Sequence, residues 1–107
     1  MNTVDKKTPS QLNIVASRLA ELGHPTRLNI FKLLVKAGDD GLSVGMIQQQ
    51  IEIPGSTLSH HISKMVNVGL INQVRVSRTL YCVPQFEALQ QVIDFLQEEC
   101  CVGETAG

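Results

Sequence analysis

The chain of 107 residues contains no tryptophan, and aromatic residues make up only 4% of it. Hydrophobic residues reach 43%, so a core can form, but a chain of this length and composition builds one that is small and aliphatic. Domains of this size often gain stability by associating, and a second copy of the chain is therefore expected.

Long apolar runs are also absent. No stretch approaches the roughly 18 consecutive apolar residues of a membrane-spanning helix, and the opening MNTVDKKTPSQ lacks the apolar run of a signal peptide. The three cysteines, two of them adjacent, do not make a secreted disulfide framework. These absences predict a soluble, cytoplasmic protein of one domain.

One segment of the chain lacks acidic residues, and another lacks basic residues. Residues 53–85 contain no Asp or Glu but include Lys64, Arg75 and Arg78. From Phe86 onward the chain has five acids and no Lys or Arg. The net charge of −1 does not favour nucleic acid by itself, but this asymmetry can mark a segment that faces a polyanion.

Apolar periodicity and turn residues predict a mainly helical chain with one β-hairpin. The expected elements are helices over 10–22, 25–37, 44–51 and 56–68, a hairpin within 70–83 that turns at Ser77-Arg78, and a last helix over 85–100. Two short helices joined by a tight turn and followed by a hairpin make a winged helix-turn-helix. The fold class is therefore mainly α with a β-hairpin wing, and the protein is expected to be dimeric.

The domain is expected to span residues 10–101, between a flexible leader (1–9) and a flexible tail (102–107). Pro9-Ser10 and Ser43 are predicted helix-start signals. Two apolar stripes are expected to pack. They are Leu28, Phe31, Leu34 and Val35 in the second helix, and Phe86, Leu89, Ile93, Leu96 and Cys100 in the last.

The helix over 56–68 has the composition of a DNA-reading helix. Leu58, Ile62 and Met65 share one face, while the opposite face carries hydroxyls, imidazole, amide and ammonium but no carboxylate, which suits a major groove. Such a face can also be merely solvated, but the glutamines before it and the arginines after it favour DNA. The predicted DNA-binding residues are Gln48, Gln49, Ser56, Thr57, Ser59, His60, Ser63, Lys64, Arg75 and Arg78.

The two histidines of this helix are expected to differ. His60 points outward and is the better DNA contact. His61 lies near the apolar face and is interpreted as a packing or orienting residue rather than a base reader. Adjacent side chains diverge on a helix, so the two do not make a metal site.

The stretches LGHPTRLNIFKLL, STLSHHISKMVNVGLI and VRVSRTLYCV closely resemble the ArsR/SmtB family of metal-sensing winged-helix repressors. The resemblance implies a homodimer formed through the first and last helices, and no enzymatic activity. It also implies that the metal-free protein binds a dyad-symmetric operator and leaves it when an inducer binds.

Two metal sites of the family lack their ligands in this chain. Ser43, Val44 and Gly45 stand where the Cys-x-Cys arsenic site would lie, and the last helix has Asp94 and Glu98 but none of the histidines that the zinc site needs. The remaining candidate is the adjacent pair Cys100–Cys101. It resembles the arsenic-responsive members that carry a C-terminal cysteine pair.

Soft thiolates select thiophilic acceptors such as As(III) or Sb(III), which are the expected inducers. The third cysteine of many relatives is missing from VGETAG, and two explanations stay open. Cys82 supplies a third sulfur, or the site has two sulfurs and suits a methylated or aryl As(III), such as methylarsenite, as well as or better than arsenite. Cys82 and Cys100 also have structural alternatives, Cys82 as a buried thiol and Cys100 as a continuation of the apolar seam, whereas Cys101 has none.

The main rival is a winged-helix repressor that senses oxidants or electrophiles through the same thiols. A helix C-terminus beside Glu98 and Glu99 raises thiol pKa values, which slows oxidation. A small thiol enzyme would need a phosphate-cradling loop or a Cys-x-x-Cys motif, and the sequence has neither. A DNA-binding protein without any ligand is the third possibility.

Overall fold

The computed structural model describes residues 10–102, so the predicted leader (1–9) and the tail beyond residue 102 lie outside the described residues. The described chain forms five helices and a three-stranded antiparallel sheet, and the predicted fold class is confirmed. The elements are α1 (Gln11–Leu22), α2 (Pro25–Ala37), β1 (Leu42–Ser43), α3 (Val44–Ile51), α4 (Gly55–Asn67), β2 (Ile71–Val76), β3 (Thr79–Pro84) and α5 (Phe86–Gln97).

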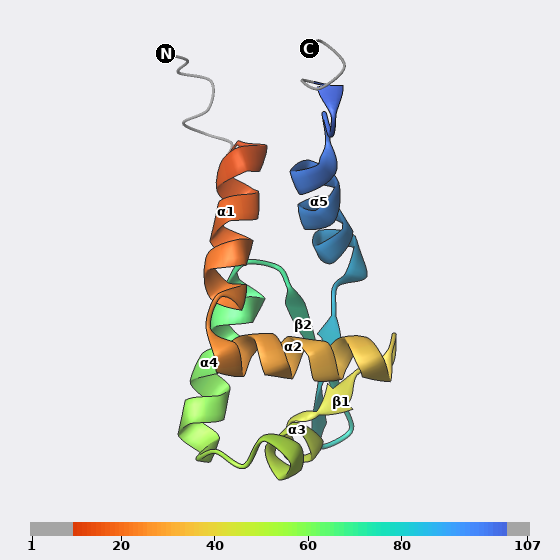
Figure 1. Ribbon diagram of the computed structural model, residues 1–107. Coiled ribbons are helices and arrows are strands. Elements are labelled where there is room, and N and C mark those ends of the chain that lie inside the picture. The colour runs from red at the N-terminus through yellow and green to blue at the C-terminus, as the bar shows by residue number, and fades with distance from the viewer. Residues whose placement is uncertain (1–9, 103–107) are drawn as a thin grey trace.

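The helices form two groups (Figure 1). α1 and α5 run side by side and project together from one end of the molecule, while α2 crosses beneath them. α3, α4 and the sheet make the opposite end, where α4 packs against α2 and β2. This arrangement separates the helix predicted to read DNA from the end of the last helix.

Two serines begin helices as predicted. The Ser10 hydroxyl accepts a hydrogen bond from the Asn13 amide (3.2 Å), and the Ser43 hydroxyl accepts one from the Met46 amide (3.1 Å). Each hydroxyl satisfies a first-turn N–H that has no partner inside the helix. The predicted start signals at Ser10 and Ser43 are therefore confirmed.

The hairpin was predicted, but the third strand was not. β3 lies between β2 and β1, and Leu42 and Ser43 pair with Cys82 and Tyr81. Gly41 leads into β1 with φ of 68°, and a Cβ there would overlap the carbonyl oxygen of Cys82. Only glycine combines this left-handed conformation with so close an approach to another backbone.

The buried core is aliphatic, as expected, and the predicted stripe of α2 faces it except at one residue. Ile30, Phe31 and Leu34 are buried, whereas Leu28 is 45% exposed. The predicted stripe was wrong at Leu28, because three- and four-residue spacing fits both choices and only the packing of α2 on α4 and β3 selects between them. The core residues shared among the elements are Ile30, Phe31, Leu34, Ile47, Leu58, Ile62, Met65, Leu70, Ile71, Cys82 and Ala88.

The last helix ends earlier than predicted. α5 stops at Gln97, and Glu98 has φ of −60° and ψ of 142°, so the chain leaves the helix before Cys100. Ala88 and Val92 are buried, but Ile93 and Leu96 are 38% and 62% exposed. The predicted seam therefore does not pack within one protomer along its whole length. Among the described residues, no helix is long and apolar enough to cross a membrane.

Arg18 joins three elements. Its Nε donates to the Val68 carbonyl (2.9 Å), and its Nη1 donates to the Gln91 side chain (2.8 Å). The guanidinium thereby holds α1 against the end of α4 and against α5. Because Arg presents several donors in a rigid fork, one side chain can fix this junction.

Candidate functional site

The exposed face of α4 has the composition that the sequence indicated. Leu58, Ile62 and Met65 are buried against the core, which fixes the rotation of the helix and turns its polar side outward. All six residues of α4 predicted to contact DNA are exposed: Ser56, Thr57, Ser59, His60, Ser63 and Lys64. A helix with short polar side chains and one ammonium can approach phosphates and base edges closely.

The N-terminus of α4 is not capped by a side chain in the described structure. Pro54 occupies the cap position, and its carbonyl accepts a hydrogen bond from the Leu58 amide (2.9 Å). Ser56 and Thr57 lie in the first turn, where backbone N–H groups point outward and the helix dipole favours an anion. This end of the helix suits a phosphate of the DNA backbone.

Gln48, predicted to contact DNA, is used inside the protein. Its side-chain Nε2 donates to the Ile53 carbonyl (3.0 Å), and the residue is half-buried. A Cβ on Gly55 would lie 3.6 Å from this amide nitrogen. Gln48 therefore holds the turn between α3 and α4, while the neighbouring Gln49 is exposed and available to a ligand.

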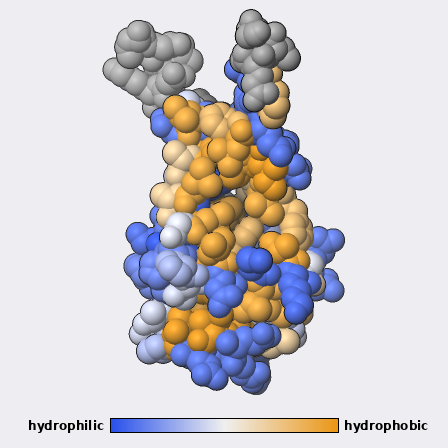
Figure 2. Space-filling view, viewed as in Figure 1, coloured by the Kyte–Doolittle hydropathy of each residue, from blue (hydrophilic) through white to orange (hydrophobic). Residues whose placement is uncertain are grey.

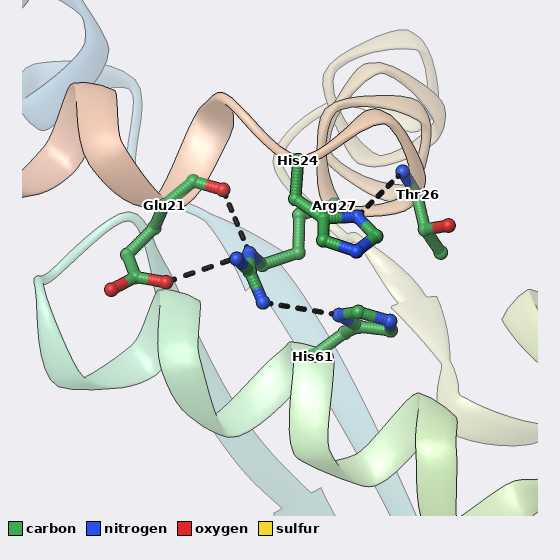
Figure 3. Close-up of polar contacts among 5 residues, drawn as sticks. All are labelled: Glu21, His24, Thr26, Arg27 and His61. Carbon is green, nitrogen blue, oxygen red and sulfur yellow. Dashed lines mark hydrogen bonds and ion pairs between the residues drawn. The ribbon is translucent and has the colours of Figure 1, made fainter.

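A polar cluster fixes α4 against the junction of α1 and α2 (Figure 3). Arg27 donates from Nε to the Glu21 carbonyl (2.8 Å), and its Nη1 donates to Nδ1 of His61 (3.2 Å). The Glu21 carboxylate lies 3.5 Å from Arg27 Nε, and the His24 and His61 rings lie 4.7 Å apart, centroid to centroid. The interpretation of His61 as an orienting residue fits its place in this cluster. Arg27 was not among the residues that the sequence indicated as functional.

The state of His61 is set by its surroundings. Burial lowers the pKa of His61, and the neighbouring His24, Arg27 and His60 lower it further. The neutral ring has a lone pair on Nδ1 that can accept from Arg27, whereas the protonated ring has none. Neutral His61 is therefore the form that maintains the contact between α2 and α4.

The two arginines of the hairpin are exposed, as is the turn between them. Arg75 lies on β2 opposite Leu80, and Arg78 lies in the turn beside Ser77, which has φ of 57°. A two-residue turn with a left-handed residue matches the twist of paired strands. The hairpin thus carries two guanidinium groups on a projecting strand pair, where they suit contact with a DNA backbone or minor groove.

The cysteine pair lies in a turn and not on the helix. The Cys100 amide donates to the Gln97 carbonyl (2.8 Å), and both Glu99 (φ 64°) and Cys101 (φ 69°) have left-handed backbones. The two sulfurs lie 2.7 Å apart, and both residues are exposed and free of disulfide bonds. The structural alternative that placed Cys100 in the core is therefore wrong for the protomer.

The contact between the two sulfurs favours the thiol form of Cys101. The hydrogen-bonding contact with Cys100 raises the pKa of the Cys101 thiol. Since thiolate is the form that reacts with oxidants, a raised pKa slows oxidation at neutral pH. A metalloid can still displace the protons as it binds, because ligand deprotonation accompanies binding.

Cys82, offered by the sequence as one of two explanations for the missing third sulfur, does not lie with the pair. Its side chain is fully buried in the core, at the β3 position that pairs with Gln73 of β2 and Leu42 of β1. Burial raises the pKa of Cys82, and a hydrogen bond from Gln73 (Nε2 to Sγ, 3.8 Å) opposes that rise. Across residues 10–102, no three His, Cys, Asp or Glu side chains gather as a metal site.

The sequence and the fold both match known regulators. Residues 22–74 match a helix-turn-helix domain family. The chain is 32% identical over 87 residues to the HTH-type transcriptional regulator YgaV of Escherichia coli (strain K12), covering 80% of this chain and 85% of that protein. The solved structure of the transcriptional repressor BigR from Xylella fastidiosa is similar, at 29% identity and a TM-score of 0.64, over 94% of this chain and 98% of that one.

A more distant structure shares the fold. The homodimeric winged helix-turn-helix DNA-binding domain Mb0332 from Mycobacterium bovis, described as a possible ArsR-family regulator, has a TM-score of 0.70 at 17% identity. The match covers 94% of this chain and 90% of that one.

Proposed function

Because the chain belongs to the HTH-type transcriptional regulators and shares its fold with an ArsR-like regulator, we propose that it is an ArsR-type repressor released from operator DNA by a trivalent metalloid. In this proposal the metalloid-free homodimer binds the operator. A trivalent arsenical or antimonite then binds Cys100 and Cys101 and releases the DNA.

The DNA-reading part of the proposal is supported by α4. Its exposed side has no carboxylate, its buried side fixes the rotation of the helix, and Lys64 supplies a cation near the end of the helix. Arg75 and Arg78 extend the positive surface onto the hairpin. Phosphate contacts from these cations would set the register of the protein on DNA, and the polar groups of α4 would read base edges.

The homodimer is supported by an uncovered apolar surface on the projecting helices. Leu12 and Leu19 of α1 and Ile93 and Leu96 of α5 are all exposed, and Figure 2 shows apolar surface running across both helices. Exposed apolar patches of this kind commonly mark protein–protein contacts. A two-fold pairing through this surface would place two copies of α4 for half-sites about 34–36 Å apart.

The inducer site is carried by one observation: two exposed sulfurs lie side by side in the turn that follows α5. Adjacent residues on an α-helix point in different directions, so two neighbouring cysteines in a helix would not chelate one atom. The turn after Gln97 removes that obstacle. Soft thiolates bind As(III) and Sb(III) in preference to hard cations.

A site with two sulfurs favours an organic arsenical. With Cys82 buried in the core, a protomer offers two accessible thiols among the described residues. A monomethyl or monoaryl As(III) has one valence on carbon and needs two sulfurs, whereas inorganic arsenite can take three. We therefore rank methylarsenite and aryl arsenicals above arsenite as inducers.

Release of DNA would follow from the place of the pair. It lies in the turn after α5, which packs against α1, and both helices belong to the proposed dimer surface. A metalloid bridging the sulfurs would fix the turn and change how α5 meets the partner protomer. A coupling free energy of about 1–3 kcal/mol is typical of such effects and would weaken operator binding about 5–150-fold.

Oxidant sensing is the second candidate, because the same two sulfurs lie side by side. The raised pKa of Cys101 opposes it, and a disulfide between adjacent residues would close a strained ring. It predicts release by peroxide, with little response to arsenicals.

The test is release of DNA measured by fluorescence anisotropy. An operator is first selected from a random duplex library with the full-length protein. The complex is then titrated side by side with arsenite, methylarsenite, phenylarsine oxide, antimonite, zinc and hydrogen peroxide. We expect release at the lowest concentration with the organic As(III) compounds; release by peroxide alone would contradict the proposal.

Two variants separate the thiols. Cys100→Ser with Cys101→Ser should bind the operator like the wild type but no longer respond to arsenicals. Cys82→Ala should keep the response, because its sulfur lies in the core. Loss of the response in Cys82→Ala with normal folding would instead assign the third sulfur to that residue.

A further inference from the structure

The hairpin has an apolar outer face. Along β2, Val74 and Val76 point away from the core, and β3 places Tyr81 opposite Val74. Val74 and Val76 are 41% and 56% exposed. Antiparallel sheets with one solvated face usually carry polar residues on that face. Exposed valines at this position are therefore unusual and indicate a contact surface.

This apolar face forms one wall of an open hollow of about 590 Å³. The hollow is lined by Val74, Val76, Tyr81 and Val83 of the hairpin and by Asp39 and Asp40 of the α2–β1 turn. A concave apolar surface edged by a few polar groups is the usual form of a binding site. We call these six residues the wing hollow.

The two carboxylates of the wing hollow define the charge of its occupant. Asp39 and Asp40 are exposed, and within residues 10–102 neither takes part in an ion pair. Beside apolar side chains, unpaired carboxylates favour a cation joined to an apolar group. They disfavour DNA phosphate, so the wing hollow is not an extension of the DNA surface.

The hairpin can serve two ligands at once. Side chains alternate across a strand, so Arg75 points to the opposite face of β2 from Val74 and Val76. β2 is also an edge strand, because the sheet order is β1-β3-β2. A partner on the outer face would leave the arginine side free and could lie along an open strand edge.

We propose that the wing hollow docks a protein segment in which lysine or arginine lies next to apolar side chains. The apolar side chains would cover Val74, Val76 and Tyr81, and the cation would pair with Asp39 or Asp40. The hollow is open and sheet-like, which suits a protein segment better than a small molecule that needs enclosure. The segment would bind the repressor while it is on DNA.

The probe is a short capped peptide in which leucine alternates with arginine, added to ¹⁵N-labelled full-length protein. We expect amide shifts in the NMR spectrum at Asp39, Asp40, Val74, Val76 and Tyr81. The matched peptide with glutamate in place of arginine should bind about tenfold more weakly or not at all, because a carboxylate would face the two aspartates.

Two double variants test the two halves of the site. Val74→Thr with Val76→Thr keeps β-branched residues but removes apolar surface, and Asp39→Asn with Asp40→Asn removes the charge. Each should weaken binding of the basic peptide about tenfold, whereas the control Glu87→Gln, which removes an exposed acid from α5, should leave it unchanged. Operator binding and release by arsenicals should remain as in the wild type for all three.

Three results would overturn the proposal. They are shifts confined to α1 and α5, equal binding of the basic and acidic peptides, and shifts at the wing hollow that depend on protein concentration without any peptide. The last would assign the hollow to a second copy of the chain. Because operator binding is measured separately, failure here leaves the proposed repressor function standing.

Discussion

Arg27 donates a hydrogen bond to Nδ1 of His61 across 3.2 Å and so joins the start of α2 to the middle of α4. The same guanidinium donates to the Glu21 carbonyl at the end of α1. One side chain therefore sets the position of α4, the proposed DNA-reading helix, relative to α1, which carries part of the proposed dimer surface. The cluster is a physical link between the two functional surfaces.

Removing that link should affect both stability and DNA binding. Arg27→Met keeps the aliphatic stem but leaves the His61 nitrogen and the Glu21 carbonyl without their donor, at a cost of about 1–3 kcal/mol. We expect a lower midpoint in urea unfolding and weaker operator binding under conditions where the variant is fully folded. Lys32→Met, an exposed cation on the same helix, is the control and should change neither by more than about 0.5 kcal/mol.

The pH dependence of stability should report His61. Its pKa in the folded protein lies below the unfolded value of 6.5, so below that pH the unfolded chain binds more protons than the folded one. The free energy of unfolding therefore falls as the pH drops from 6.5 towards the folded pKa. The contribution of neutral His61 to stability is fully present above pH 6.5.

Urea midpoints measured between neutral and mildly acidic pH would check this expectation. His61→Gln should flatten the His61 part of the slope, since Gln does not titrate, and His60→Gln on the exposed side of α4 is the control. An unchanged slope in His61→Gln would show that another group is responsible.

Substitutions at Gly38 and Gly41 allow the free-energy cost of backbone strain to be compared with the added cost of steric overlap. Gly38 has φ of 92° with no atom within 4 Å of an added Cβ, while at Gly41 (φ 68°) the Cβ would overlap the Cys82 carbonyl. Gly38→Ala should cost about 1–3 kcal/mol, because φ of 92° with ψ of −156° is a backbone conformation essentially restricted to glycine, and Gly41→Ala should cost more because β1 must also move away from β3. Equal losses in thermal or urea unfolding would contradict the overlap.

Several parts of the fold could be predicted from the sequence because their signals are local. Ser10 and Ser43 were recognised as caps, and the spacing of Leu58, Ile62 and Met65 gave the rotation of α4. The exposed DNA-facing candidates on that helix followed from the same rotation. These features depend on residues within a few positions of one another.

Other parts required tertiary information. β1 has two residues and exists only because β3 lies beside it. The choice of Ile30 over Leu28 depends on what α2 packs against. The Arg27–His61 contact joins residues 34 positions apart, and the use of Gln48 inside the α3–α4 turn could not be read from its polarity.

The end of α5 was missed for a related reason. Helices commonly end at a glycine in the left-handed region, but here Glu99 takes that conformation and no glycine marks the stop. The sequence alone extended the helix to Cys100, which would have kept the thiols apart. The turn that brings the sulfurs together is therefore a finding of the structure.

The proposed DNA surface predicts a specific response to salt. Lys64→Gln and Arg78→Gln each remove one cation from the proposed interface. Each should weaken operator binding and reduce the slope of log K against log salt by about 1, as expected for one lost phosphate contact. Lys36→Gln, an exposed cation in the last turn of α2, is the control and should leave the slope unchanged.

The turn at the cysteine pair predicts a difference between two variants of one residue. Residues 98–101 are exposed, so little packing holds the turn, and Glu99 adopts a left-handed backbone that costs a non-glycine residue roughly 1–2 kcal/mol. Glu99→Gly lowers the cost of the turn, while Glu99→Ala keeps it and favours extension of the helix. Both remove the same carboxylate, so they form a matched pair.

Because chelation by two adjacent thiols needs the turn, Glu99→Gly should bind phenylarsine oxide more tightly than Glu99→Ala, by about fivefold for a difference near 1 kcal/mol. Competition against a soluble dithiol would measure the two affinities. Circular dichroism of the free proteins should show slightly more helix in Glu99→Ala. Equal affinities together with equal helix content would contradict this prediction. The turn would then be fully formed without the metalloid, and binding of the metalloid would not depend on a competition between helix and turn.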